Sequence, residues 1–385
     1  MEGVGRFAQW GLETALPFWA EHGWDDVHGG FAESLALDGS PISGDMRRVR
    51  VQARQIYVFA HAHHQGWGFG LERAEEAMNL LRKRAWRVDG RPGWVHLLTD
   101  RGVVANPVRD LYDHAFILLA LAWLGRASGD QAWFDLADET LAWLDGAMAD
   151  PAGGYVESIS GAHWPRRQNP HMHMFEALMA LYEATGRADI LARASAIKAL
   201  FDRVFYQRGP AVVREFFNAD WSRATGDLGS VVEPGHLCEW AWLLHEFHRL
   251  SGQPLDPAAD TLFETAMQSG INPATGLLYA AINARGEALD GSSRTWMQTE
   301  WLRVAALRRR LDLPGAAAHL QAAEAAMLDY HLDNVISGGW IDQFDARGKP
   351  ASERIPASTL YHVFGAIIEC ACLESDRTHP AGTVV

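Results

Sequence analysis

The sequence predicts an all-α fold, an (α/α)6 barrel in which six inner and six outer helices form a toroid, with short β-hairpins at one rim. Three observations carry this prediction. A glycine-aromatic element recurs along the chain at intervals of 60 to 63 residues, a strongly apolar run follows each copy, and one-sided amphipathic runs lie between them. A fixed period of this kind indicates a chain built from copies of one supersecondary unit.

The glycine-aromatic elements mark the repeats. The clear copies are Gly29-Gly30-Phe31, Gly93-Trp94, Gly153-Gly154-Tyr155, Gly276-Leu277-Leu278-Tyr279 and Gly338-Gly339-Trp340. A weaker copy, VVREFFNAD around Arg214-Glu215, fills the one gap in the series. We expect these elements to form the hairpins at the rim.

The apolar runs predict the inner helices. They are VQARQIYVFAHAH, LYDHAFILLALAWLG, NPHMHMFEALMALYEATG, GHLCEWAWLLHEFHRLSG, TWMQTEWLRVAALRRR and STLYHVFGAIIECACLE. Each is apolar nearly all round, as expected of a helix buried on most sides. Asn169-Pro170 has the form of a helix start, and Gly129, Gly186 and Gly252 stand where inner helices should end. An open solenoid would expose a polar concave face, so a closed toroid is favoured.

Runs such as ERAEEAMNLLRKRAW, AWFDLADETLAWLDGAM and AAAHLQAAEAAMLDYHL predict the outer helices, because each has one apolar stripe. No linker-like stretch rich in Pro or Ser divides the chain. We therefore expect a single catalytic domain over residues 1–375, followed by a C-terminal tail over residues 376–385.

Composition excludes several classes of partner. The formal net charge of −14 disfavours nucleic acid and anionic membranes, which reward basic patches. No apolar run approaches the ~20 residues of a membrane span, and the start of the chain has no signal-peptide pattern. Cys238, Cys370 and Cys372 lie in apolar runs and indicate reduced thiols. We expect a cytoplasmic protein; a homodimer is the assembly left open.

The chemistry is expected where the inner helices begin. Up-and-down connectivity points all inner helices the same way, so their N-terminal ends converge on one pocket. Polar residues stand at equivalent places there, although burying one without a partner costs about 1–3 kcal/mol. They are Arg54, Tyr112, His114, Asn169, His173, His236, Glu239, Trp296, Gln298, Glu300 and His362.

Each of these residues also has a structural interpretation. Asn169 can be a helix cap, and a single buried histidine is more often structural than catalytic. Glu239 follows His236 by one helical turn, so it can orient the imidazole or simply form a buried pair with it. His171 and His173 do not share a helix face, and no HExxH or Cys/His spacing occurs. We therefore expect no metal and no cofactor.

Several motifs identify a family. RVQARQIYVFAHAH, NPHMHMFEA, EPGHLCEWAWLL, TWMQTEWLR and GGWIDQFDARGKP with IPASTLYH resemble the N-acylglucosamine 2-epimerase superfamily, most closely its branch with D-mannose isomerase and sulfoquinovose isomerase. The resemblance runs from about residue 20 to residue 370. It implies the toroid, a metal-free mechanism, and His236 and His362 as the acid/base pair at C1 and C2 of a monosaccharide.

The same resemblance implies further roles. Arg54 would hold the sugar oxygens and stabilise an enediolate, and Glu239 and His173 would complete the catalytic ring. The residues implied to line the sugar pocket are Asn169, Tyr112, Trp296 and Gln343, beside the candidates His114, Gln298 and Glu300 at the helix starts.

The predicted reaction interconverts D-mannose and D-fructose through a cis-enediol, since histidine, with an unperturbed pKa of ~6.5, can take and return a proton near neutrality. A sugar 2-epimerase, of mannose/glucose or N-acylglucosamine type, is the alternative because it uses the same intermediate. A more remote one is an inverting glycosidase with two carboxylates from Glu33, Glu157, Glu239 and Glu300. The acidic chain favours a neutral sugar, while Arg47, Arg48, Arg50, Arg166 and Arg167 leave a phosphate or sulfonate site open.

Overall fold

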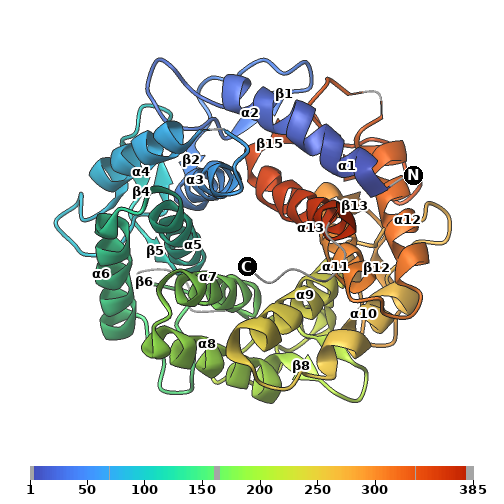
Figure 1. Ribbon diagram of the computed structural model, residues 1–385. Helices are drawn as coiled ribbons and strands as arrows, with labels where there is room; N and C mark the ends of the chain where they lie inside the picture. The colour runs from blue at the N-terminus through green and yellow to red at the C-terminus, as the bar shows by residue number, and fades with distance from the viewer. Residues whose placement is uncertain (1–3, 69, 160–164, 334, 379–385) are drawn as a thin grey trace.

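Two concentric rings of helices make up the molecule (Figure 1). The computed structural model describes residues 4–68, 70–159, 165–333 and 335–378. The inner ring consists of α3 (Val49–His64), α5 (Leu111–Ser128), α7 (Asn169–Thr185), α9 (Pro234–Ser251), α11 (Thr295–Arg310) and α13 (Leu360–Thr378). The predicted (α/α)6 toroid is confirmed.

The outer ring alternates with the inner one along the chain. It consists of α4 (Leu71–Ala85), α6 (Gln131–Ala147), α8 (Ala188–Leu200), α10 (Ala258–Ser269) and α12 (Ala316–Ala326). Its remaining place is taken by the start of the chain, where α1 (Val4–Trp10) and α2 (Leu16–His22) are joined by a π-helical turn, Gly11–Ala15. α1 packs against both α13 and α12, so the first helix covers the last repeat.

The ends of the inner helices follow the predicted signals. Gly129, Gly186 and Gly252 cap α5, α7 and α9 with φ of 72°, 66° and 67°, the left-handed conformation that glycine adopts without a steric cost. α13 runs through residues 376–378, the first part of the predicted tail, and residues 379–385 of that tail lie outside the described residues.

Short antiparallel strands lie at the end of the toroid where the inner helices begin. The pairs are β2 (Arg47–Arg48) with β3 (Leu97–Leu98) and β4 (Val104–Asn106), β5 (Arg109–Asp110) with β6 (Ser158–Ile159), β7 (Arg166–Arg167) with β10 (Phe216–Phe217), β8 (Tyr206–Gln207) with β9 (Val212–Val213), β11 (Ala281–Ile282) with β12 (Ala288–Asp290), and β13 (Ser293–Arg294) with β14 (Gln343–Phe344). Some form hairpins within one connection (β3–β4, β8–β9 and β11–β12), and the others join neighbouring repeats.

One further strand pair closes the ring. β1 (Ser34–Ala36) pairs with β15 (Arg354–Pro356), in the register that sets Leu35 opposite Ile355. The first repeat is thereby joined to the last by the same kind of antiparallel contact that joins the others.

The glycine-aromatic elements form single bridges rather than full hairpins. The bridged pairs are Trp24 with Phe31, Trp86 with Trp94, Ala149 with Tyr155, and Ile271 with Leu278. In each case the chain leaves an outer helix, turns at the glycine and returns before the next strand. At Gly154, with φ of 71°, an added Cβ would lie 2.7 Å from the His171 ring, so a larger residue has no room.

A polar side chain near the start of the following inner helix fastens each of these turns by accepting a hydrogen bond from its backbone N–H. Gln52 accepts from the backbone N–H of Phe31 at 2.8 Å, and His114 accepts from that of Trp94 at 3.1 Å. His171 accepts from the backbone N–H of Tyr155 at 3.1 Å, and Gln298 accepts from that of Leu278 at 3.2 Å. Part of the repeated polarity that the sequence shows at the helix starts is therefore structural.

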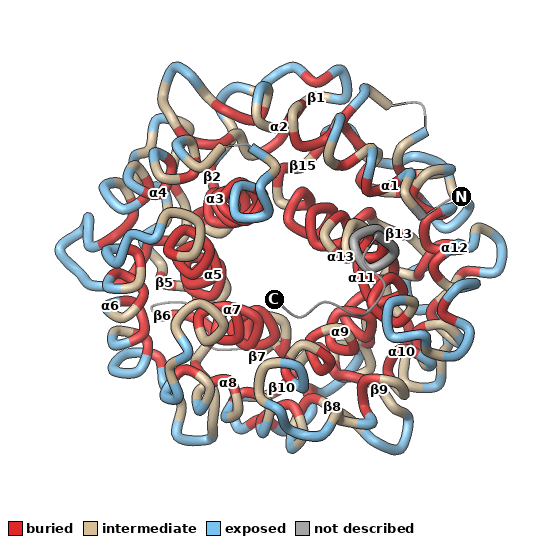
Figure 2. The backbone as a smooth tube through the Cα atoms, in the orientation of Figure 1, coloured by how far each residue is buried: buried red, intermediate tan, exposed pale blue. Residues whose placement is uncertain are grey.

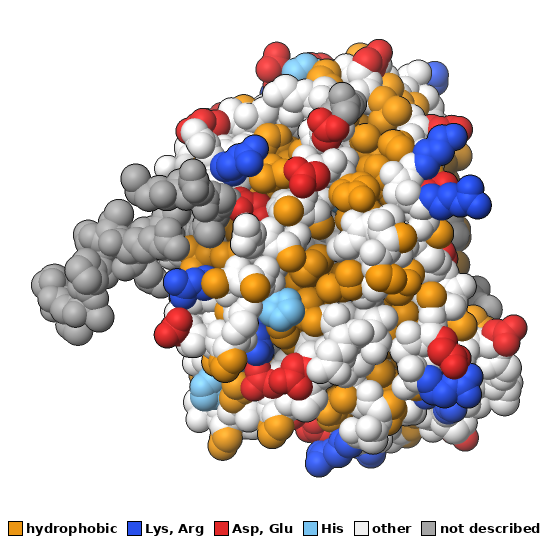
Figure 3. All heavy atoms as spheres, turned by 90° about the vertical axis from the view of Figure 1, so that its right-hand side faces the viewer, with side chains coloured by type: hydrophobic (Ala, Val, Ile, Leu, Met, Phe, Trp, Pro, Cys, Tyr) orange, Lys and Arg blue, Asp and Glu red, His pale blue; other side chains and the backbone are white. Residues whose placement is uncertain are grey.

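Burial is concentrated in the inner ring (Figure 2). On the outer face shown in Figure 3, acidic and basic side chains are interspersed with apolar ones. No helix in the described ranges is long and apolar enough to cross a membrane.

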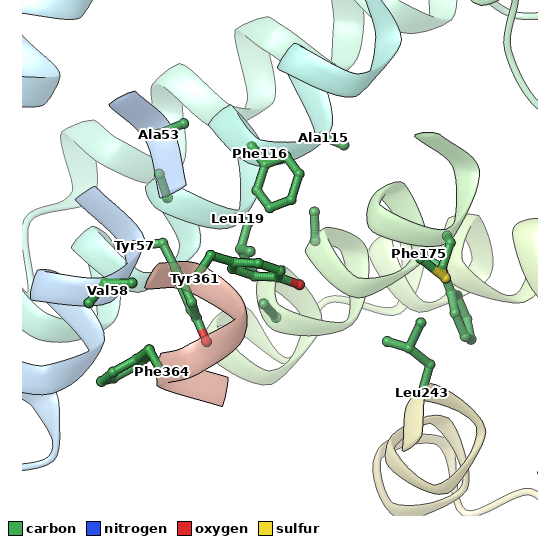
Figure 4. Close-up of a cluster of buried hydrophobic side chains, with 14 of the residues drawn as sticks. Ala53, Tyr57, Val58, Ala115, Phe116, Leu119, Phe175, Leu243, Tyr361 and Phe364 are labelled. Atoms are coloured by element: carbon green, nitrogen blue, oxygen red, sulfur yellow. The ribbon is translucent and has the colours of Figure 1, made fainter. Parts of the chain in front are cut away.

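Near the axis, aromatic rings from α3, α5 and α13 gather (Figure 4). Tyr361 lies 5.6 Å from Tyr57 and 5.0 Å from Phe116 between ring centroids, and we call these three residues the aromatic plug.

Candidate active site

A cavity of about 290 Å³ opens where the N-terminal ends of the inner helices converge. Every inner helix contributes to its wall. The predicted residues that line it are Arg54, Tyr112, Asn169, His173, His236, Trp296 and His362, joined by Arg48, Arg50, Glu233, Arg294, Pro356, Ser358 and Thr359. We call it the catalytic cavity.

Other predicted site residues do not line this cavity. His114 and Gln298 are buried and face the glycine-aromatic turns that they fasten. Gln343 lies in β14, paired with Arg294, and its backbone N–H donates to Ser352. Glu239 and Glu300 are buried beside His236 and His362 without lining the cavity.

His362 is held by Glu300. The Nδ1 atom of His362 lies 2.7 Å from Oε1 of Glu300, which is completely buried on α11. Burial raises the pKa of Glu300 to about 7, and burial together with the neighbouring Arg54 holds the pKa of His362 well below its usual value. When Glu300 is ionised, Nδ1 donates to it and Nε2 retains its lone pair, which makes His362 a base.

His236 has the opposite electrostatic surroundings. Its Nδ1 atom lies 3.0 Å from Oε1 of Glu215 and 3.4 Å from Oε2 of Glu233. Burial opposes its protonation, but these carboxylates outweigh burial and raise the pKa of His236 to about 10. The Nε2 atom lies 3.2 Å from the Asn169 side-chain nitrogen. The two carboxylates favour the imidazolium form of His236, in which the ring can donate a proton.

The carboxylate at His236 differs from the one expected. Glu239 is one turn further along α9, but neither of its oxygens has a hydrogen-bond partner among the described residues. The His236 ring turns instead toward the segment between β9 and β10, which carries Glu215. Gln168 fixes that carboxylate with a 3.0 Å hydrogen bond. The only sequence signal for Glu215 was its place in the weak repeat copy.

The interpretation of Asn169 as a helix cap is wrong, because its side-chain amide faces the His236 ring and not a backbone N–H of α7.

Arg54 differs from the other arginines of the catalytic cavity in having no carboxylate partner within the described residues. Its Nη2 donates to the Tyr112 hydroxyl at 2.9 Å and its Nη1 to the Ser358 carbonyl at 3.0 Å. Its guanidinium lies 4.2 Å from the Phe116 ring centroid. The remaining arginines pair with acids: Arg48 with Glu33, Arg50 with Asp113, and Arg294 with Asp342. Arg54 therefore offers this cavity a positive charge that no carboxylate of the described residues neutralises, which is the kind of group that can stabilise an oxyanion.

A buried carboxylate network lies beneath the histidines. We define it as Glu176, Glu239, Glu300 and Arg303. Arg303 reaches Glu176 at 3.3 Å and Glu300 at 3.5 Å, and Glu176 lies 3.4 Å from Nδ1 of His173. Tyr361 donates its hydroxyl hydrogen to Glu176. Burial and the nearby Glu300 raise the pKa of Glu239 well above its usual range, which favours the neutral form of this carboxyl group.

Sequence reasoning missed Glu176 and Arg303. Each stands three residues after a predicted site residue, His173 and Glu300, and this spacing was the available signal.

Several groups have donor atoms close enough to hold a metal ion. They are Glu215, Glu233 and His236; Glu239, Glu300 and His362; His173, Glu176 and Glu239; and, at the rim, His96, Asp110 and Asp113. Within the cavity groups, the contact of Glu215 with His236 and that of Glu300 with His362 already use Nδ1. A metal ion would have to displace these contacts.

The comparisons with known proteins agree with this arrangement. The chain is 35% identical to a mannose-6-phosphate isomerase of Rhizobium meliloti over 95% of this chain and 96% of the relative, and 27% identical to a D-mannose isomerase of Marinomonas mediterranea over 89% and 91%. A crystal structure of D-mannose isomerase superposes with a TM-score of 0.84 at 23% identity, covering 95% of this chain and 97% of that one. These findings define the protein as a sugar isomerase or epimerase.

The family follows from a further match. The sequence profile of the N-acylglucosamine 2-epimerase (GlcNAc 2-epimerase) family matches residues 29–366. The chain belongs to the N-acylglucosamine 2-epimerase family.

Proposed function

We propose that the protein interconverts D-mannose and D-fructose through a cis-enediol, with histidines as acid and base and no metal. The observation that carries this proposal is the placement of two histidines in one cavity, each with its Nδ1 atom beside a different buried carboxylate, Glu300 for His362 and Glu215 for His236. Their surroundings act in opposite directions, since the pKa of His362 is held well below its usual value and the pKa of His236 is raised to about 10. Pairs of groups with pKa values pushed apart are typical of acid/base assignments.

The reaction starts from the open-chain aldose. Nε2 of His362 removes the C2 proton, and the released electron pair forms the C1=C2 double bond while O1 takes a proton from His236. His362 then returns its proton to C1. The O2 proton goes back to His236 as the C2 carbonyl forms, so both histidines end in their starting states. Arg54 stabilises the charge that develops on the oxygens.

This division of labour favours isomerisation over epimerisation. In an aldose–ketose isomerisation one base removes and returns the proton on the same face, which His362 can do alone. Epimerisation would require delivery of a proton to the opposite face of C2. In that alternative His236 would act at carbon rather than at oxygen, and the product would be an aldose.

A phosphorylated sugar is the second candidate, because the Rhizobium meliloti relative carries the name mannose-6-phosphate isomerase. Arg48, Arg50 and Arg294 line the cavity mouth and could meet a phosphate. Each already pairs with a carboxylate, so a phosphate would have to break an ion pair. We therefore place free D-mannose first. Parallel assays of D-mannose and D-mannose 6-phosphate decide between them by kcat/KM.

Incubation with D-mannose in D₂O tests the reaction. NMR of the product should show D-fructose with deuterium at C1, because the proton held by His362 exchanges in part with solvent. D-glucose that carries deuterium at C2 would instead establish epimerisation. No conversion of D-mannose, or a product without any deuterium, would overturn the proposal. Activity should persist after dialysis against EDTA; its loss, with recovery on adding a divalent ion, would contradict the metal-free mechanism.

A further inference from the structure

A second cavity lies at the opposite end of the toroid, where the inner helices finish. Its volume is about 230 Å³. Every inner helix again contributes, with His61, Trp123, Glu183, Trp242, Arg310 and Glu369 as representatives of α3, α5, α7, α9, α11 and α13 in turn. None of the residues assigned above to proton transfer lines it.

The rings of the aromatic plug, which Figure 4 shows packed together, contact residues that line each of the two cavities. Arg54, in the wall of the catalytic cavity, has its guanidinium 4.2 Å from the Phe116 ring and 5.1 Å from the Tyr361 ring. Tyr57 packs against Tyr361 from the other side and lines the second cavity. The two cavities have no lining residue in common, so the second cavity is distinguished from the catalytic cavity by its residues.

The charged groups of the second cavity balance one another. Arg126 pairs with Glu183 at 2.7 Å, and Arg310 pairs with Glu369 at 3.1 Å. Arg249 likewise pairs with Glu183 and Glu246, and Arg303 with Glu176. Burial holds the pKa of His61 well below its usual value, so this ring adds no charge. A wall of matched ion pairs favours an uncharged ligand over a phosphate or an amine.

The polar atoms of this wall are held in fixed positions. The Trp242 indole N–H donates to Glu369 at 2.8 Å, and the Arg303 guanidinium lies 3.4 Å from the Trp242 ring centroid. The Nε atom of Arg303 is buried and has no acceptor among the described residues. A buried donor without a partner is unfavourable, and a ligand hydroxyl beside it would supply the missing acceptor. Carboxylates and guanidinium groups side by side suit hydroxyls, because each hydroxyl both donates and accepts.

We propose that this second cavity binds a neutral polyhydroxyl compound of monosaccharide size. The volume lies below the ~300–1,000 Å³ typical of pockets for larger organic ligands, which suits one sugar ring or one sugar alcohol. Because Arg303 contacts both this cavity and Glu300, the occupant reaches the partner of His362 through a single side chain. This connection to catalysis rests on the role proposed for His362; the binding site does not.

Fluorine NMR of the protein labelled with 5-fluorotryptophan tests the proposal. Trp242 reports on the second cavity and Trp296 on the catalytic cavity, and the variants Trp242→Phe and Trp296→Phe assign the two resonances. The labelled protein is titrated with D-mannose, D-fructose and D-mannitol, and separately with inorganic phosphate. We expect the Trp242 resonance to shift with its own saturation curve for at least one of the three polyhydroxyl compounds.

Two variants locate that response. Ala180→Phe fills the second cavity from α7, and Glu369→Gln removes a carboxylate from its wall while the amide oxygen can still accept from Trp242. Both should raise the Kd read from Trp242 at least tenfold and leave the Trp296 titration unchanged.

The outcomes separate this proposal from the proposed function. A Trp242 resonance that stays fixed, or that follows Trp296 and ignores Ala180→Phe, would overturn the second site. A response to phosphate alone would overturn the neutral ligand. A fixed Trp296 resonance with a titrating Trp242 would support the second site and count instead against sugar binding in the catalytic cavity.

Discussion

The substitution Glu300→Gln isolates the role of the carboxylate behind His362. A glutamine keeps the size of the side chain and can still accept from Nδ1, so only the charge is lost. Hydrogen bonds to charged groups contribute about 1.5–3 kcal/mol and neutral ones about 0.5–1.5 kcal/mol, a difference of about 1–1.5 kcal/mol. At about 1.4 kcal/mol per factor of ten, kcat/KM should fall roughly tenfold at pH 8.

The pH dependence is the sharper assay. Below the pKa of Glu300, which is about 7, the protonated carboxyl donates to Nδ1, places the ring proton on Nε2 and removes the base. The kcat/KM of the native protein should therefore fall as the pH drops through about 7. In Glu300→Gln nothing titrates at this position, so the acidic limb should disappear and the profile should be flat down to the pH where the fold is lost.

Two further variants calibrate this result. Glu324→Gln is a matched control, since Glu324 is also buried and accepts one hydrogen bond, from the Phe7 backbone, but lies on the outer helix α12. Its profile should match that of the native protein. His362→Ala should cost about 10²–10⁴-fold, the range for a positioned acid/base group. An unchanged acidic limb in Glu300→Gln, or a loss equal to that of His362→Ala, would refute the reasoning.

Three other substitutions extend the test. Glu215→Gln removes a carboxylate 3.0 Å from His236, so the basic limb of kcat/KM should move down from about pH 10 toward neutrality; a limb that stays in place would mean that another acid titrates. Arg54→Lys loses the planar fork and should reduce kcat by about 10²–10³-fold in steady-state assays, and a native kcat would exclude oxyanion stabilisation there. Gln298→Ala should lower the free energy of unfolding in urea by about 1–3 kcal/mol and leave KM unchanged, because it leaves the buried Leu278 N–H without an acceptor. A raised KM would indicate that Gln298 takes part in substrate binding.

The fold could be predicted from sequence because its signal is distributed over the whole chain. Apolar helices repeated at a fixed interval can be buried in only a few arrangements. Among these, a closed ring covers every inner helix. The terminal glycines Gly129, Gly186 and Gly252 added the exact stopping points. What the pattern could not distinguish was a full hairpin from the single bridges that the glycine-aromatic turns make.

The site was harder to predict because helix starts mix two kinds of polar residue. His171 and His173 are two positions apart, which is about 200° around a helix, so His171 faces a turn while His173 faces the axis. Without the neighbouring repeat in place, either could be the functional one. The same ambiguity misplaced His114 and Gln298.

Partners from distant segments escaped sequence reasoning for a different reason. Glu215 reaches His236 from a loop whose path depends on the pairing of β10 with β7, and no local spacing records that pairing. Glu239 was the carboxylate that local helical spacing favoured. It lies instead among the carboxylates Glu176 and Glu300; burial and these carboxylates raise its pKa, and neither of its oxygens has a hydrogen-bond partner among the described residues.

The pairing of β1 with β15 has a consequence for how the protein acquires its activity. Arg54 is oriented by the carbonyl of Ser358, 304 residues later in the chain, and the neighbouring Gln55 donates to the carbonyl of Ala357 across 302 residues. Contacts of such sequence separation form late, since their loop-closure entropy is lost before they contribute. During synthesis Arg54 therefore has Tyr112 as a partner early, but it gains the Ser358 carbonyl only when the final repeat has emerged. A chain that lacks that repeat also lacks His362, so the wall of the catalytic cavity is incomplete.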